Sequence, residues 1–189
     1  MVEATVENTT NMEKDLTAAQ NDYAHFLPAL SGFYATYVGK QRYDEYVEST
    51  RIPSNFQNGV ETLNYLNKTD GAFQYKWTLY SAGHADLDIT KFVPKEDMVR
   101  NRDRENTWLL GDSGGFQIGK GVWEGDWKDP NCPKAQKKRD GVLRWMDAYM
   151  DYGMILDIPA WVARSPAGAK ATGISTYQEA VVATRINND

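Results

Sequence analysis

The stretch TWLLGDSGGFQIGKG, residues 107–121, changes from apolar to polar within a single turn. Its first five residues predict a buried strand over 107–111. The apolar run ends at Asp112, and Ser113, Gly114 and Gly115 follow it directly. Barrel enzymes and open α/β sheets keep their sites at the carboxyl ends of strands. The segment is therefore either a tight structural turn or the floor of an active site.

The sequence on both sides repeats the alternation of strand and helix. Strands are predicted over 73–83 and 154–161, and helices over 93–106 and 135–152, with a long loop over 118–134. This order favours an α/β fold with a parallel sheet buried between helices. A last helix is predicted from Ser175 or Thr176, because Glu179 follows at the spacing of a capping box. Three strands do not close a barrel, so we expect the N-terminal part of a longer protein.

The first 72 residues show a different pattern. Residues 1–11 are polar and acidic and predict a disordered tail. Residues 12–72 predict a mainly helical segment, with helices over 12–27, 40–50 and 57–67. The sequence thus divides into a tail, a helical N-terminal segment and a sheet-forming region over 73–189.

The charge of the chain is unevenly distributed. The net charge of −5 argues against a protein coated in basic residues, but a local basic patch is enough to bind nucleic acid. Six basic and only two acidic residues lie between Lys128 and Arg144. A solvated loop and helix start explains this run when it is viewed alone. The candidates for contact with a nucleic-acid backbone are Lys134, Lys137, Lys138 and Arg139.

Cysteine and histidine are scarce. Cys132 is the only cysteine, so an internal disulfide is excluded, and with His25 and His84 alone a site of several Cys and His ligands is out of reach. We therefore expect no metal and no cofactor in this chain. The sequence also has neither a signal peptide nor a stretch long enough to span a bilayer, so no membrane partner and a cytoplasmic location are expected.

The residues of the turn suit a flat heterocyclic ligand. Gly114 and Gly115 carry no side chain, so a ring can approach the backbone, while Phe116 offers a stacking face and Gln117 a donor and an acceptor. Asp112 is positioned for acid/base chemistry. Asp157 ends the next predicted strand, and in a parallel sheet its carboxylate can face the same pocket. A helix cap or loop anchor remains an equal alternative for Asp157.

These motifs resemble those of a known enzyme family. LLGDSGGFQIG resembles the DSGGFQ or DSGGYQ motif of the tRNA-guanine transglycosylase family, and GMILDIPAW resembles the strand that follows it there. The resemblance covers about residues 75–165. It implies a (β/α)8 TIM barrel, here incomplete, with about three N-terminal barrel strands preceded by the helical segment. Residues 73–189 would then be the N-terminal part of a transglycosylase domain.

The resemblance also implies a role for each residue of the turn. Asp112 would be the general acid/base, Phe116 would lie against the face of the exchanged base, and Asp157 would accept hydrogen bonds from its ring N–H and exocyclic amine. His84 would contact phosphate or sugar, although a loop histidine without a role is the alternative. The remaining substrate-binding positions are Ser113, Gly114, Gly115 and Gln117.

The reaction implied is exchange of guanine for a 7-deazaguanine such as preQ0 or preQ1. The tRNA enzymes carry Glu-Cys-Thr-Pro after the second Asp, whereas here Ile158, Pro159 and Ala160 follow Asp157. The sequence is most similar to the phage-type branch that modifies DNA, so DNA is favoured over tRNA as partner, with the host cytoplasm as location. The family's nucleophilic Asp and its zinc cluster would lie beyond Asp189.

Three alternatives stay open. The first is a tRNA-guanine transglycosylase of the queuosine or archaeosine pathway. The second is a catalytically incomplete barrel that only binds a base, and the third is an unrelated barrel hydrolase or lyase that uses Asp112 and Asp157 as an acid/base pair. A homodimer is also left open.

Overall fold

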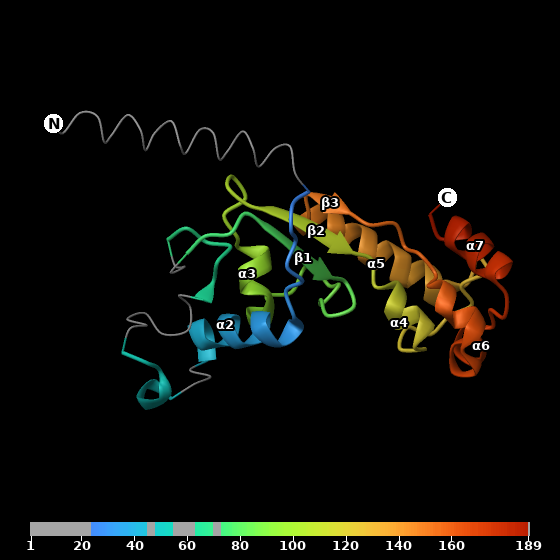
Figure 1. Ribbon diagram of the computed structural model, residues 1–189, viewed down its shortest axis with the longest axis horizontal. Coiled ribbons are helices and arrows are strands. Elements are labelled where there is room, and N and C mark those ends of the chain that lie inside the picture. Colours follow the sequence, from blue (N-terminus) through green and yellow to red (C-terminus); the bar gives the residue numbers. More distant parts are fainter. Residues whose placement is uncertain (1–23, 45–47, 55–62, 70–72, 189) are drawn as a thin grey trace.

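The computed structural model describes residues 24–44, 48–54, 63–69 and 73–188 (Figure 1). The described part is a mixed α/β structure, with a small parallel sheet flanked by helices. No helix in it is long and apolar enough to cross a membrane. In chain order the elements are α2 (Gly32–Asp44), η1 (Ser49–Arg51), β1 (Trp77–Ser81), η3 (Pro94–Glu96), α3 (Asp97–Arg100), β2 (Trp108–Asp112), α4 (Gly115–Gly119), α5 (Pro133–Tyr149), β3 (Tyr152–Gly153), η4 (Ala160–Arg164), α6 (Pro166–Thr172) and α7 (Tyr177–Ile186).

The strands lie side by side in the order in which they occur in the chain. The sheet is β1-β2-β3 and all its pairs are parallel, with Ser81 opposite Asp112 and Leu110 opposite Tyr152. The segment before α2 adds a parallel bridge to the free edge of β1, where Leu30 donates its N–H to the Leu79 carbonyl over 2.8 Å. The α/β class and the parallel sheet predicted from the sequence are therefore confirmed.

The two faces of the sheet differ. On one face, Gly111 lies against Met146 of α5 and Met150, which follows that helix, and the Tyr80 ring is 6.1 Å from that of Trp145. On the other face, the first residues of the strands form an aromatic stack in which Trp108 lies 5.8 Å from Trp77 and 6.0 Å from Tyr152. Trp108 and Tyr152 remain 42% and 56% exposed, so α5 covers only one side of the described sheet.

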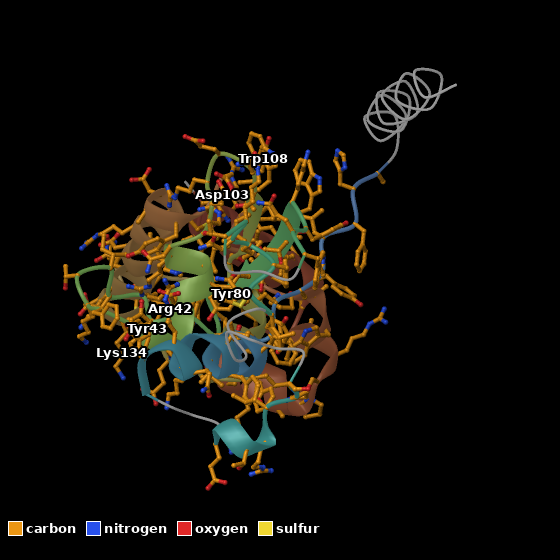
Figure 2. The ribbon with its side chains drawn as sticks, turned by 90° about the vertical axis from the view of Figure 1, so that its left-hand side faces the viewer. Arg42, Tyr43, Tyr80, Asp103, Trp108 and Lys134 are labelled. Carbon is orange, nitrogen blue, oxygen red and sulfur yellow. The ribbon has the colours of Figure 1, made fainter. Side chains whose placement is uncertain are left out.

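Helix α2 is attached to the rest of the molecule through a buried carboxylate. Asp97, at the start of α3, is 4% exposed and accepts hydrogen bonds from Arg42 Nη1 (3.1 Å) and the Tyr43 hydroxyl (2.8 Å). Figure 2 shows Arg42 and Tyr43 next to each other, and in Figure 1 their helix α2 lies beside α3. A buried charge that keeps two donors is strongly held, so this contact fixes α2 against α3.

The helices predicted before residue 73 are only partly present. Residues 12–23 of the first lie outside the described residues, as do 45–47 of the second, 57–62 of the third and the 1–11 tail. Residues 24–27 and 63–67 form no α-helix, which makes those predictions wrong at these positions. The reason at 24–27 is tertiary pairing: the His25 ring stacks on Trp77 at 4.2 Å, and Tyr75 donates to the Phe26 carbonyl.

The second predicted helix begins earlier than its sequence pattern indicates. α2 starts at Gly32 rather than at residue 40, because the Ser31 hydroxyl accepts the Tyr34 N–H over 3.1 Å and caps the helix. Other boundaries shift less. β1 is shorter than the predicted 73–83, β2 is displaced by one residue, and α5 begins at Pro133 and ends at Tyr149. Helix α4 lies partly in the predicted loop, and α6 was not predicted.

The prediction of a strand over 154–161 is wrong. β3 is Tyr152–Gly153, residues 154–159 are irregular, and η4 begins at Ala160. Side chains near the end of α7 take the place of a neighbouring strand here. The Asn188 carboxamide bonds both the N–H and the carbonyl of Leu156, and Thr184 accepts the Ile158 N–H. Met154 still donates its N–H to the Gly111 carbonyl of β2 over 2.8 Å, whereas the backbone at Leu156 and Ile158 is hydrogen-bonded without a sheet partner.

The capping box of α7 is present as predicted. Thr176 Oγ1 accepts the Glu179 N–H over 3.2 Å, and Glu179 Oε2 accepts the Thr176 N–H over 3.0 Å. The hydrogen bond from the Ser175 N–H is the main cause that lowers the pKa of Glu179 below 4.5. Since the folded pKa is depressed, the stabilisation is complete above pH 4.5 and disappears as the pH falls through the folded value.

We therefore expect Glu179→Gln to lower the unfolding midpoint at pH 7 and to have progressively less effect as the pH falls below 4.5. Urea unfolding of both proteins across this range measures the difference. The exposed Gln178, changed to Glu, serves as a control for added or removed charge on the same helix. An effect of Glu179→Gln that is equal at pH 7 and pH 3 would rule out a contribution of the ionised carboxylate.

Candidate functional site

The carboxyl ends of β1 and β2 bring the Asp112 turn next to Gly83. Asp112 is the last residue of β2, and its carbonyl accepts the Ala82 N–H over 2.8 Å. Gly111, one residue earlier, faces α5, so the half-buried Asp112 side chain points to the opposite face of the sheet. A cavity of about 400 Å³ opens at the same end of β1, lined in part by Ala82, Gly83, Trp123 and Lys138.

The two glycines of the turn have separate structural reasons. Gly114 adopts φ +83°, a left-handed conformation that favours glycine, and α4 begins at the next residue. Gly115 instead allows a close approach. A Cβ there would lie 2.2 Å from the Asp157 carbonyl oxygen and 3.0 Å from Asp157 Oδ1. The sequence predicted that Asp157 lies near this turn, and in the structure Asp157 packs directly against the backbone of Gly115.

A buried hydroxyl of the turn and a buried amide oxygen of α4 have no hydrogen-bond partner in the described part of the chain. Ser113 is fully buried, and neither its hydroxyl nor Gln117 Oε1 has a hydrogen-bond partner among the residues described. The Gln117 carboxamide lies against the Gly83 Cα, where a Cβ would come within 2.1 Å of its nitrogen. Buried polar atoms normally have partners, so groups left without one mark a place where a polar ligand can bind.

An aromatic pair lies beside the turn. The Phe116 side chain is 55% exposed, and its ring centroid is 5.9 Å from that of Trp161 at an interplanar angle of 54°. Lys120 Nζ is 5.4 Å from both ring centroids. Trp161 and Lys120 were not among the predicted site residues. Their signal in the sequence was proximity alone, because Lys120 lies in the quoted stretch and Trp161 follows Asp157 by four positions.

His84 lies at the same end of β1 but packs in another direction. Its N–H bonds the Ser81 carbonyl over 3.0 Å, and its Cβ is 3.3 Å from the position of a Cβ on Gly32, the first residue of α2. The bridge at Ala29 puts the chain that leads into α2 on the edge of β1 opposite β2. The structure therefore sets the exposed His84 on the α2 side of β1.

The loop that follows β1 is fixed by a buried ion pair. Glu96 is fully buried, accepts the Asp86 N–H and pairs with Arg100 Nε over 2.8 Å. Arg100 also donates to the Asp86 carbonyl and lies 4.8 Å from the centroid of the Tyr149 ring. Burial, followed by the Glu96 carboxylate, raises the pKa of Tyr80 beneath this loop. The wall of the cavity at the end of β1 is therefore rigidly supported.

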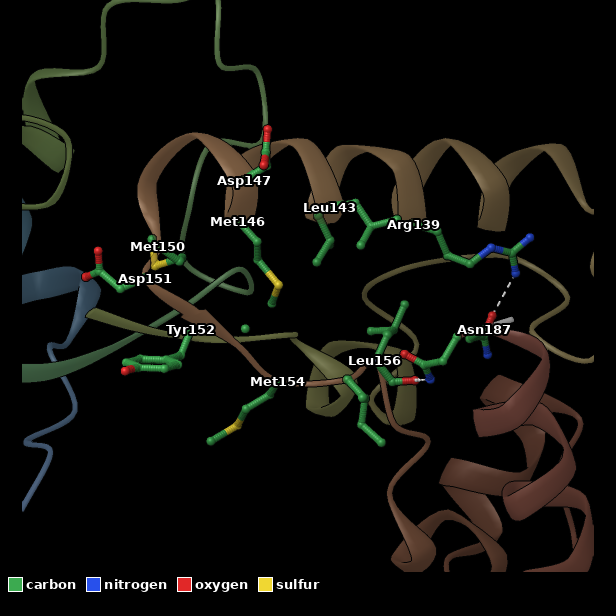
Figure 3. Close-up of a pocket in the computed structure, with 14 residues that line it drawn as sticks. Arg139, Leu143, Met146, Asp147, Met150, Asp151, Tyr152, Met154, Leu156 and Asn187 are labelled. Carbon is green, nitrogen blue, oxygen red and sulfur yellow. Dashed lines mark hydrogen bonds between the residues drawn. The ribbon is translucent and has the colours of Figure 1, made fainter. Parts of the chain in front are cut away.

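The basic run divides into paired and free side chains. Lys134 pairs with Glu124 over 2.7 Å, and Arg139 bonds Asn187 Oδ1 and the Pro130 carbonyl, each over 2.7 Å. Figure 3 shows the Arg139–Asn187 bond, which joins α5 to the end of α7. Lys138 Nζ lies 4.7 Å from the centroid of the Trp123 ring, and that ring contacts Gly114. Lys137 is exposed.

These lysines, but not Arg139, border a shallow groove of about 910 Å³. Because Trp123 touches both Lys138 and the glycine of the turn, the groove begins next to the Asp112 site. Acids also line it, so the groove is not uniformly positive. Its charged residues are Lys134, Lys137, Lys138, Arg144, Asp88, Glu124 and Asp140.

No cluster of three or more His, Cys, Asp or Glu side chains that could hold a metal ion occurs within residues 24–44, 48–54, 63–69 and 73–188. Comparison with known proteins finds no match among family models, curated proteins or solved structures. Any assignment of function must therefore rest on the geometry of the turn and on the sequence motifs.

Proposed function

We propose that the chain forms the base-binding part of a nucleic-acid guanine transglycosylase. The observation that carries this proposal is the contact of Asp157 with Gly115, beside the unpartnered polar atoms of Ser113 and Gln117. A purine that lies over a glycine backbone needs acceptors for its N–H groups and donors for its carbonyl. The Asp157 carboxylate would accept hydrogen bonds from the N–H groups of the base, and the Gln117 amide would donate one to its carbonyl. The exposed Phe116 ring offers a face for stacking.

We further propose that the sheet belongs to a (β/α)8 barrel. The strand order follows the chain without a reversal, whereas doubly wound sheets reverse their order at the ligand site. In a barrel, one face of the sheet packs on helices and the other fills the interior. The exposed Trp108, Tyr152 and Met154 side chains on the face opposite α5 support this arrangement, because that face needs a further apolar layer.

In the proposed reaction a carboxylate attacks C1′ of the sugar, and the bond from C1′ to guanine N9 breaks. The leaving base takes a proton from Asp112, which acts as general acid. The incoming 7-deazaguanine returns a proton to Asp112 as its N9 attacks C1′ and expels the enzyme carboxylate. This double displacement follows the logic of retaining glycosidases. The attacking carboxylate is assigned to a later strand through the family resemblance alone.

DNA is proposed as the substrate, and this preference rests on the sequence. The groove beside Trp123 is the surface that would hold the backbone, because Lys137 and Lys138 lie along it next to the turn. The target base must leave its stack to reach a pocket at a strand end.

The double substitution of Lys137 and Lys138 by Ala should weaken DNA binding and lower the salt dependence of log Kd by about two units of slope. The free energy of unfolding should fall by no more than about 1 kcal/mol, since Lys137 is exposed and the Lys138 ammonium loses only its contact with the Trp123 ring. Arg139→Ala should instead leave DNA binding unchanged. It should lower the free energy of unfolding by about 1–2 kcal/mol, because the hydrogen bonds from Arg139 to Asn187 and to the Pro130 carbonyl are lost. Fluorescence anisotropy with labelled DNA and urea unfolding separate the two effects. Unchanged DNA affinity and slope for the double variant would exclude this groove.

A further inference from the structure

Lys120 is an exposed cation placed on the aromatic pair of the candidate site. It follows the last residue of α4, and its ammonium lies 5.4 Å from the centroids of both Phe116 and Trp161. In the described part of the chain no carboxylate forms a salt bridge with it. An ammonium held over two aromatic faces is oriented by them, yet keeps its full charge for another partner.

The Trp161 ring is itself held firmly. A Cβ on Gly119 would lie 2.7 Å from this ring, and one on Gly168 would lie 3.1 Å from it. The indole is thus seated between the backbones of α4 and α6. Phe116 lies in α4 and Lys120 directly follows that helix. The Trp161 ring, packed between α4 and α6, therefore fixes the positions of both residues relative to α6.

The charges around the turn give Lys120 a distinct role. The two carboxylates of the site, Asp112 and Asp157, favour N–H groups and repel a phosphate. The phosphate of a nucleotide is one sugar away from its base. When a base stacks on the exposed Phe116 ring, the Lys120 ammonium, 5.4 Å from the centroid of that ring, is the group placed to offset this repulsion.

We propose that Lys120 binds the phosphate of the nucleotide whose base occupies the site, an inference that rests on the base-binding function proposed above. The site would receive two purine-like bases in turn, one attached to a sugar phosphate and one free. Lys120 strengthens binding of the base that is attached to a sugar phosphate and not of the free base. It therefore determines specificity, because it distinguishes the nucleotide that is to be exchanged from the incoming base.

The experiment titrates the 189-residue chain with dGMP and with deoxyguanosine at low ionic strength, using calorimetry. The unmodified protein should bind dGMP about tenfold more tightly than deoxyguanosine, as expected for one charge-assisted contact. Lys120→Ala should abolish this preference and leave deoxyguanosine affinity unchanged, and Lys120→Arg should retain most of it. Lys76→Ala is the matched control and should keep the full preference, because this exposed lysine precedes β1 at the amino end of the strands, opposite to the candidate site. Added salt should reduce the preference.

Two results would overturn the proposal while leaving the base site intact: equal affinity of the unmodified protein for the two ligands, or a preference that survives in Lys120→Ala. Failure of the unmodified protein to bind deoxyguanosine at all would contradict the base-binding function itself. Circular dichroism of each variant confirms that a lost preference does not come from unfolding.

Discussion

Asp112→Asn is expected to lower the rate of base exchange by about a thousandfold while base binding is retained. The substitution keeps the shape of the side chain and its place at the end of β2, but an amide cannot donate and recover a proton at neutral pH. The base contacts proposed for Asp157, Gln117 and Phe116 do not depend on that proton. The loss should therefore appear in the turnover rate rather than in affinity.

The measurement is the incorporation of labelled guanine into DNA by the protein expressed from its complete gene, together with calorimetric binding of guanine. Asp147→Asn is the control, because Asp147 is an exposed acid on α5 whose side chain points away from Tyr152 and Met154 (Figure 3). Exchange by Asp112→Asn within about tenfold of the unmodified rate would remove Asp112 from the acid/base role.

Gly115→Ala is expected to abolish base binding and to destabilise the fold. The new methyl would meet the Asp157 carbonyl oxygen at 2.2 Å, and that atom belongs to the backbone, so the chain must move. Overpacking of this kind costs about 1–3 kcal/mol. The movement displaces the Asp157 carboxylate from the edge of the site, which should lower base affinity at least tenfold.

The matched control is Gly141→Ala. Gly141 lies within α5, and a Cβ there would be 3.5 Å from Leu87, which is ordinary van der Waals contact. Replacing a helical glycine should raise stability by about 0.5–1 kcal/mol and leave base binding unchanged. Urea unfolding and calorimetric titration of both variants test the pair. Normal guanine affinity in Gly115→Ala would mean that Asp157 does not contact the base.

The parts of the fold that local sequence determines could be predicted. β2 was predicted because an apolar run ends at Asp112, and the start of α7 was predicted because Thr176 and Glu179 satisfy each other's backbone. The order of strands and helices follows from the same alternation of patterns. Each of these signals lies within a few residues of the element that it specifies.

The parts that depend on distant partners could not be predicted. The apolar run after Met154 reads as a strand, but Asn188 and Thr184 occupy its hydrogen bonds. Helical spacing before Pro28 likewise gives way to the packing of His25 on Trp77. In both places the competing contact comes from residues at least 26 positions away, which no local pattern can reveal.

The candidate site shows the same division. The proximity of Asp157 to the Asp112 turn was predicted from the meeting of strand ends in a parallel sheet, although Asp157 lies in an irregular segment and not at a strand end. Trp161 and Lys120 could not be identified, since the socket formed by Gly119 and Gly168 exists only once α4 and α6 pack together. The basic run was identified, but its pattern could not show that Arg139 is engaged by Asn187.

The central claim is base exchange in nucleic acid, and labelled guanine tests it most directly. The protein expressed from its complete gene is incubated with labelled guanine and either DNA or tRNA, and the nucleosides are then separated by mass spectrometry. The proposal predicts labelled deoxyguanosine in DNA that is absent when Asp112 is changed to Asn. Label in neither nucleic acid, from a protein that still binds guanine, would contradict a transglycosylase and leave a protein that only binds the base.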